Sequence, residues 1–174
     1  NVSSPQDIIK EGVALITEDR KVTGLNLSGT VNDNIAMVAI KKLLTNGLYN
    51  KSKAYKASQE YIEKLNIKTP SANQIVGNLS GGNQQKVVIA KWLLNEPHMI
   101  MLDEPTRGID VGAKRDIYVL LGKLVQQGKA VIMISSEIPE LMGICDRVLV
   151  MCEGNDSGEV KREDFSQERI MTLA

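Results

Sequence analysis

The sequence predicts an α/β fold with a mostly parallel sheet and a small helical subdomain. Short apolar runs alternate with longer stretches of helical periodicity, which is the pattern of strand–helix units. One apolar run ends in two adjacent carboxylates, Asp103 and Glu104, as expected of a strand that delivers acidic side chains to its C-terminal tip. Residues 31–71 differ from the remainder because their pattern is mostly helical.

Turn and capping residues define the N-terminal elements. Ser4-Pro5 predicts the start of a short helix, since proline is tolerated in the first turn. Val13–Ile16 is interpreted as a buried strand, and it leads into the charged segment Thr17–Lys21. Thr30 is a predicted N-cap for a helix over residues 30–44, which ends at Asn46-Gly47.

Two further helices are predicted in the middle of the chain. Lys51–Leu65 is amphipathic and is stopped by Thr69-Pro70. Gly82–Leu94 is the next helix, and its lysines, Lys86 and Lys91, are predicted to point away from its packing face. That face is formed by Val87, Val88, Ala90, Leu93 and Leu94.

The C-terminal part continues the alternation of strands and helices. A loop over Pro105–Asp110 follows the acidic pair. The remaining elements are predicted as a helix Val111–Gln127, a strand Ala130–Ile134, a helix Ile138–Ile144, a strand Arg147–Cys152, a turn Glu153–Gly158, a return strand Glu159–Lys161 and a terminal helix Ser166–Leu173.

Composition narrows the class of protein. The 174 residues carry 21 basic and 21 acidic side chains, so the net charge of zero gives no sign of a nucleic-acid surface. Cys145 and Cys152 lie in apolar surroundings and are interpreted as buried thiols in a reducing cytosol. No apolar run approaches the roughly 18–20 residues that span a bilayer, and no signal peptide is visible. We therefore expect any membrane role to depend on a partner chain.

The segment Leu79–Lys86, Leu-Ser-Gly-Gly-Asn-Gln-Gln-Lys, is the first chemical motif. A helix that begins at two glycines behind Ser80 presents backbone N–H groups without intrahelical partners, at the positive end of the helix dipole. Glycines let a ligand approach that backbone closely. The motif therefore predicts a phosphate-binding helix start. Asp103-Glu104, about twenty residues later, suits Mg²⁺ binding and the activation of a water molecule.

These two motifs resemble those of the ABC-type ATPases. Leu79–Gln85 resembles the ABC signature, and Met99–Glu104 resembles Walker B. Asn83–Lys86 and Asp103–Lys114 are similar, more narrowly, to the second nucleotide-binding half of the tandem ATPase subunits of monosaccharide importers. The resemblance extends from Thr17 to the C-terminus. It implies a partial P-loop NTPase core over residues 1–30 and 76–174, with a helical subdomain at residues 31–75 that faces a membrane partner. Helices that simply cap the core are compatible with that role.

The resemblance also implies a role for each site residue. Ser80, Gly81 and Gly82 would contact the γ-phosphate of an ATP held by the opposite half, and Gln84 belongs to the same nucleotide-contacting motif. Asp103 would hold Mg²⁺, and Glu104 would act as general base towards the attacking water. Asp110 falls in the D-loop, which crosses the dimer interface.

Two positions depart from the family pattern. Glu18 occupies the place of the Q-loop glutamine, where it is a further candidate ligand of Mg²⁺; taken alone, its segment reads as a solvated loop of charges. Ser136 stands where the family has a switch histidine and carries no imidazole to contact the γ-phosphate. We therefore hypothesise that the site built on Asp103 and Glu104 is catalytically impaired and that the chain mainly lends Ser80–Gly82 to a competent site.

The sequence contains no G-x-x-x-x-G-K-[ST] phosphate-binding loop. The simplest expectation is a fragment that lacks the N-terminal part of the nucleotide-binding domain and that alone neither binds ATP tightly nor hydrolyses it. In the family, the strand preceding this loop lies between those corresponding to Ala130–Ile134 and Arg147–Cys152. Either these flanking strands pair anew or another chain supplies the missing edge.

The expected function is that of an ATP-hydrolysing subunit that powers sugar import, bound peripherally at the cytoplasmic face of the cell membrane. Its expected cofactors are ATP and Mg²⁺. Its expected partners are a second nucleotide-binding half, membrane permease subunits and, indirectly, a periplasmic or extracellular sugar-binding protein, with no nucleic acid. Two alternatives remain: a soluble ABC ATPase of the DNA-repair or translation type, and a non-catalytic dimerisation module. The sequence does not identify the sugar.

Overall fold

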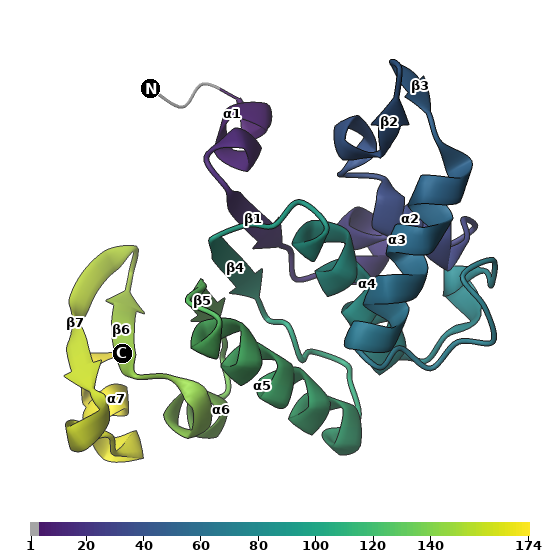
Figure 1. Cartoon of the computed structure of the whole chain (residues 1–174). Coiled ribbons are helices and arrows are strands. Elements are labelled where there is room, and N and C mark those ends of the chain that lie inside the picture. Colours follow the sequence, from purple (N-terminus) through teal and green to yellow (C-terminus); the bar gives the residue numbers. More distant parts are fainter. Residues whose placement is uncertain (1–3) are drawn as a thin grey trace. The chain divides into compact units, whose positions relative to one another are not determined.

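The computed structural model describes residues 4–174, in which internal contacts separate a unit that ends at Ile132 from a second unit, Met133–Ala174. The central sheet has the strand order β1-β4-β5, with β1 at Val13–Ile16, β4 at Met99–Asp103 and β5 at Ala130–Ile134 (Figure 1). β1 and β4 are parallel, and Ile16 is in register with Leu102. This confirms the predicted strands and places the C-terminal ends of β1 and β4 at one edge of the sheet.

The first unit has its core between the sheet and the helix α4, Gly81–Leu93. Ala14, Ile16, Ile100 and Leu102 are buried on the strands, because alternate residues of a strand share one face. The short helix α1, Pro5–Lys10, begins after Ser4 as predicted; the Ser4 hydroxyl accepts a hydrogen bond from the Asp7 amide at 3.3 Å. A π-helical turn η1, Arg20–Gly24, occupies part of the charged loop after β1.

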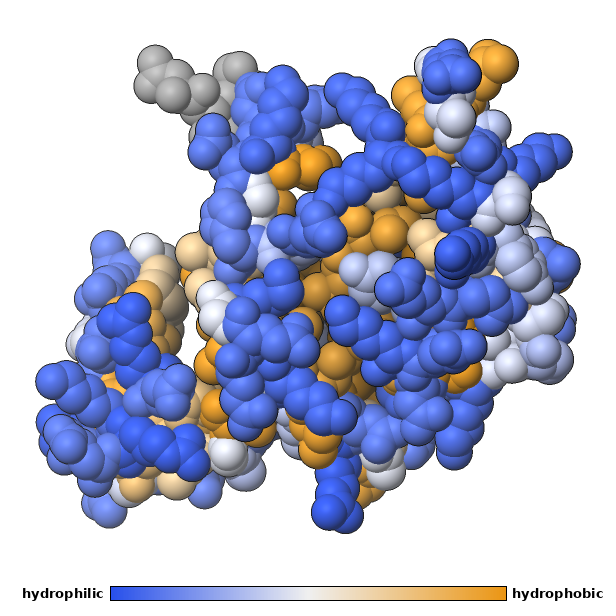
Figure 2. All heavy atoms as spheres, viewed as in Figure 1, coloured by the Kyte–Doolittle hydropathy of each residue, from blue (hydrophilic) through white to orange (hydrophobic). Residues whose placement is uncertain are grey.

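The predicted helix over residues 30–44 is wrong beyond its first turns. Thr30 does begin a helix, α2, with a complete capping box to Asp33, but this helix spans only Val31–Ala36. A 3₁₀ turn η2, Ile40–Leu43, follows, and then a hairpin of β2, Leu44–Thr45, and β3, Leu48–Tyr49. Asn46 and Gly47 have φ values of 51° and 80°, so they form a tight hairpin turn rather than a helix end. The hairpin is prominent at the upper right of Figure 2, where hydrophobic surface is visible among hydrophilic residues.

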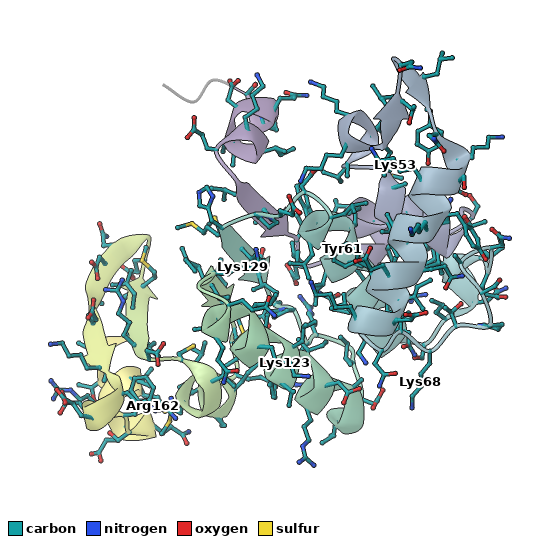
Figure 3. All side chains as sticks on the ribbon, in the orientation of Figure 1. Lys53, Tyr61, Lys68, Lys123, Lys129 and Arg162 are labelled. Carbon is teal, nitrogen blue, oxygen red and sulfur yellow. The ribbon has the colours of Figure 1, made fainter. Side chains whose placement is uncertain are left out.

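The second predicted helix of this region is confirmed as α3, Lys51–Lys64. Tyr61 lies on α3 (Figure 3), and its hydroxyl donates to the carbonyl of Leu93 on α4 at 2.8 Å. The start and end of the helical region lie side by side: the Val31 amide donates to the Gln74 carbonyl at 2.9 Å, and the Val76 amide to the Gly29 carbonyl at 3.0 Å. A 3₁₀ turn η3, Val76–Asn78, then leads into α4.

Helix α5, Val111–Gln126, follows the acidic pair and completes the part of the unit that bears the motifs. In the second unit, helix α6, Ile138–Ile144, precedes an antiparallel hairpin of β6, Arg147–Cys152, and β7, Asn155–Lys161. The return strand starts earlier than predicted because the turn consists of Glu153 and Gly154, both with positive φ. A 3₁₀ turn η4, Arg162–Asp164, and helix α7, Gln167–Leu173, end the chain.

The core of the second unit is formed by residues of the hairpin and of α7, namely Val148, Val150, Val160 and Ile170. Within the described residues β5 pairs in the central sheet and β6 pairs with β7 in a separate sheet, so β5 and β6 have not paired with each other. No helix among residues 4–174 combines the length and hydrophobicity needed to cross a membrane.

Candidate functional site

Ser80 stands at the N-cap of α4 and is exposed, but its side chain does not cap the helix. Its hydroxyl oxygen instead accepts a hydrogen bond from Asn83 Nδ2 at 2.9 Å. The N–H groups of a first helical turn have no partner within the helix, and a side-chain cap usually satisfies one of them. In the part of the chain that the structure describes, no side chain caps the first-turn amides of α4, and phosphate binding at this helix start remains a prediction.

The two glycines of this motif are also closely packed against other parts of the chain. A Cβ atom on Gly82, which is buried, would overlap the Cβ of Ala113 on α5. A Cβ atom on Gly81 would lie 2.8 Å from Nη2 of Arg20 and 3.3 Å from the Gly108 carbonyl oxygen. Beside the predicted approach of a ligand, these glycines therefore also serve a close contact between α4 and α5 and leave space for Arg20.

The acidic pair lies at the carboxyl end of β4. Asp103 is the last residue of the strand, and Glu104 directly follows it with φ of +44°. A glutamate in the left-handed region is strained by roughly 1–3 kcal/mol, and such strain persists where the surrounding structure holds it. The turn after Glu104 is closed by a hydrogen bond of 3.1 Å from the Arg107 amide to the Glu104 carbonyl. The backbone thus fixes the direction in which the Glu104 side chain leaves the strand.

Glu18 lies at the same edge of the sheet, because β1 and β4 are parallel and their ends are in register. Its carboxylate forms an ion pair with the guanidinium of Arg107, in the turn after the acidic pair. Since both side chains are largely exposed, this pair contributes little to stability. The ion pair places the Arg107 guanidinium against the Glu18 carboxylate, which is a candidate Mg²⁺ ligand. Binding of Mg²⁺ by Glu18 remains a prediction.

Two of the remaining predicted site residues, Asp110 and Gln84, form hydrogen bonds within the chain. Asp110 is the N-cap of α5, where its Oδ1 accepts from the Ala113 amide at 2.9 Å. Gln84 is buried, and its Nε2 donates to the Val76 carbonyl at 3.3 Å. Ser136 is exposed in the second unit, after β5. The nucleotide contacts predicted for these three residues remain predictions.

The donor set at the acidic pair suits Mg²⁺ only in part. Carboxylate oxygens, as on Asp103 and Glu104, are ligands that this ion accepts. Among residues 4–174, however, no group of three or more His, Cys, Asp and Glu side chains gathers closely enough to hold a metal ion. The residues therefore fit an ion that takes its other oxygen ligands from phosphate and water, which is how Mg²⁺ is commonly held.

Two residues of α4 were placed wrongly by the sequence analysis. Lys86 and Lys91 are both 5% exposed and do not point away from the packing face. Lys86 Nζ donates to Asp116 Oδ2 at 2.9 Å and to the Asn66 carbonyl at 3.2 Å, and its hydrogen bond lowers the pKa of Asp116. Lys91 Nζ donates to the Gly24 carbonyl, and burial lowers the pKa of Lys91. The sequence signal for this burial is the unbroken apolar run Val87–Ala90, because a helix that is apolar on all sides is usually buried on all sides.

Asp116→Asn is expected to destabilise the chain by about 1–2 kcal/mol, because it leaves the buried Lys86 ammonium without its anionic partner. This expected loss of stability is smaller than that for a fully buried ion pair, because the Asp116 side chain is 54% exposed. Urea unfolding at neutral pH measures this loss. The lowered pKa of Asp116 means that its contribution is present above the ordinary pKa of 3.8 and is lost as the pH falls through the lowered value. The difference between wild type and variant should therefore shrink as the pH falls through the lowered pKa, and a difference that does not change with pH would contradict this assignment.

The chain matches a known family model and several curated proteins. The family model described as ABC transporter matches residues 4–107. A ribose import ATP-binding protein of Clostridium tetani is 53% identical over 100% of this chain and 35% of its own length. A xylose import ATP-binding protein of Thermoanaerobacter pseudethanolicus is 51% identical over 99% of this chain and 34% of its own length. The chain therefore spans about a third of the length of these relatives.

Solved structures agree on the fold. One ATP-binding cassette of an ABC transporter superposes with a TM-score of 0.79 at 22% identity, covering 98% of this chain and 71% of the other. A dimeric cassette in a post-hydrolysis state with ADP and Pi gives a TM-score of 0.75 at 24% identity, covering 95% and 70%. The predicted α/β class with an ABC ATPase core is thereby confirmed.

Proposed function

The chain belongs to the ABC transporter family, and on that premise we propose that it supplies the signature helix and the Walker B strand of an ATP-hydrolysing subunit that powers sugar import. The observation that carries the proposal is the start of α4, where an exposed Ser80 leaves the first-turn amides uncapped. Identity of 53% and 51% to ribose and xylose import ATP-binding proteins favours a sugar as the transported solute.

In this proposal the start of α4 completes a triphosphate site of a second nucleotide-binding half. The Ser80 hydroxyl and the amides of Gly81 and Gly82 donate hydrogen bonds to the γ-phosphate, whose negative charge the helix dipole also stabilises. Because these donors are fixed by the fold before the nucleotide arrives, they need no reorganisation as charge develops. Asp110, at the start of α5, lies in the segment proposed to cross the dimer interface.

Asp103 and Glu104 are proposed to serve the chain's own nucleotide site. Mg²⁺, when bound there with ATP, would neutralise phosphate charge and order the phosphate oxygens. Asp103 would hold that ion, and Glu104 would accept a proton from the attacking water. Glu18 and Ser136 replace the glutamine and histidine of the family pattern, so we propose that this site turns over slowly and that the donated Ser80–Gly82 segment is the larger contribution.

The proposed assembly contains a second nucleotide-binding half and membrane permease subunits, with a sugar-binding protein outside the membrane. The chain would act at the cytoplasmic face of that membrane, held there by the permease. The alternative of a soluble ATPase that acts on nucleic acid is not supported by the ribose and xylose relatives, because both are import ATP-binding proteins. The alternative of a non-catalytic dimerisation module does not explain Glu104. A domain that only dimerises would have no need of a general base at that position.

A segment exchange tests the proposal. This chain replaces the matching third of the Clostridium tetani ribose import ATP-binding protein, and ribose uptake is measured in cells that carry the cognate permease. We expect uptake within about tenfold of the parent, since a tenfold change corresponds to only about 1.4 kcal/mol. The control is the matching segment of a soluble ABC ATPase, which should give no uptake. A chimera that assembles with the permease but transports nothing, or that co-purifies with nucleic acid, would contradict the proposal.

A further inference from the structure

Arg20 connects three segments that are distant in sequence. It lies in η1, after β1, and its Nη1 donates to the Arg107 carbonyl at 2.8 Å while its Nη2 donates to the Gly108 carbonyl at 3.3 Å. The same Nη2 occupies the space beside Gly81 that a Cβ atom would fill. One guanidinium thus touches the start of α4 and the turn between Glu104 and Asp110.

The geometry is specific to arginine. Two neighbouring carbonyls accept from the two ends of one planar fork, an arrangement that the single ammonium of a lysine does not reproduce. The Nε of Arg20 is buried and has no hydrogen-bond partner among residues 4–174. Leaving a buried donor unsatisfied is unfavourable, so the side chain is held in this place by the contacts of its other nitrogens and by packing.

The neighbouring ion pair between Glu18 and Arg107 does not supply the same constraint. Its side chains are 44% and 68% exposed, and an exposed pair of this kind adds little. Arg20 instead donates to two backbone oxygens, 87 and 88 residues away, and these oxygens belong to the turn itself. The turn in question carries Asp110 to the start of α5 and follows directly on Glu104.

We propose that Arg20 is a positioning residue that sets the start of α4 relative to the turn Arg107–Gly108, and we call this arrangement the Arg20 brace. It favours glycine at position 81, because a Cβ atom there would lie 2.8 Å from Nη2 and is expected to shift the guanidinium away from its carbonyls. The brace holds the Ser80–Gly82 donors and the segment that leads to Asp110 as one unit. This inference rests on the proposed function for its catalytic consequence only.

The structural consequence is tested in the chain itself by amide hydrogen exchange. Arg20→Met keeps an apolar stem but removes the fork, and it should speed exchange of the Arg107 and Ile109 amides, which close the turn, by about tenfold. Arg20→Lys should restore only part of the protection. The matched control is Lys21→Gln, which removes the adjacent exposed cation and should leave both amides unchanged. Exchange in Arg20→Met that stays within twofold of wild type would overturn the brace.

The catalytic consequence is measured in the assembled importer. Arg20→Met should lower kcat for ATP by about tenfold and leave KM nearly unchanged, because misplaced donors weaken the transition state rather than the initial binding of nucleotide. Gly81→Ala should give a similar loss, and the double variant should be no worse than either single one, since both remove the same contact. If the kcat losses of the two single variants multiplied in the double variant, the two residues would not act through one shared contact. An importer without any ATPase activity would contradict the proposed function, while the exchange measurement would still decide on the brace.

Discussion

Ser80→Arg is expected to reduce sugar uptake by the assembled importer by at least about a hundredfold, the loss that follows removal of one preorganised donor to a developing anion. The structure gives two reasons. Ser80 is exposed at the start of α4, so an arginine there extends over the first-turn amides that the proposal assigns to the γ-phosphate. The variant also loses the hydroxyl whose oxygen Asn83 Nδ2 holds at 2.9 Å. Uptake and ATP hydrolysis are measured together.

Glu104→Gln is the informative comparison for Ser80→Arg. It keeps the shape of the side chain but removes the proposed proton acceptor, and it should lower uptake by no more than about fivefold if the chain's own site is already slow. Ser157→Arg, a serine-to-arginine change at an exposed position of β7, is the matched control and should be silent. The proposed division of labour would be reversed if Glu104→Gln abolished uptake and Ser80→Arg had no effect.

Gly82→Ala is expected to lower the free energy of unfolding by about 2–3 kcal/mol, as overpacking of a close contact does. The added Cβ atom meets the Cβ of Ala113, so α4 and α5 have to move apart. Urea unfolding of the chain measures the loss. The expected loss of stability is large because the clash is between Cβ atoms of two packed helices. Neither atom is the end of a flexible side chain that could move aside.

Two variants control for other effects of a glycine replacement. Ala113→Gly in the Gly82→Ala background removes the opposing methyl group and should recover most of the loss, apart from roughly 1 kcal/mol for a glycine in a helix. Gly122→Ala, elsewhere on α5, adds a Cβ that meets no atom from outside its own stretch of helix within 4 Å among the described residues, and it should stabilise the chain by about 0.5–1 kcal/mol. An equal loss in the variants at positions 82 and 122 would show that the contact with Ala113 is not the cause.

Local sequence signals were enough for most elements. Ser4 and Thr30 begin helices as predicted, and the apolar runs before Thr17 and Glu104 are the parallel strands of the sheet. The exceptions are turns. Asn46-Gly47 was interpreted as a helix end, although the same dipeptide with positive φ at both residues is the turn of a two-residue hairpin. Both uses need a left-handed residue, so the dipeptide alone does not distinguish them.

The sequence by itself determined most strands and helices outside residues 37–49, the positions of the two motifs and the family, because these depend on residues close together along the chain. Only the tertiary structure showed that Lys86 is buried against Asp116, 30 residues away, and that Arg20 reaches the backbone at Gly108, 88 residues away. A long cationic side chain can be solvated or can be held by a carboxylate or carbonyl from another segment. Which of the two occurs is decided by the partners that the folded chain brings within hydrogen-bonding distance.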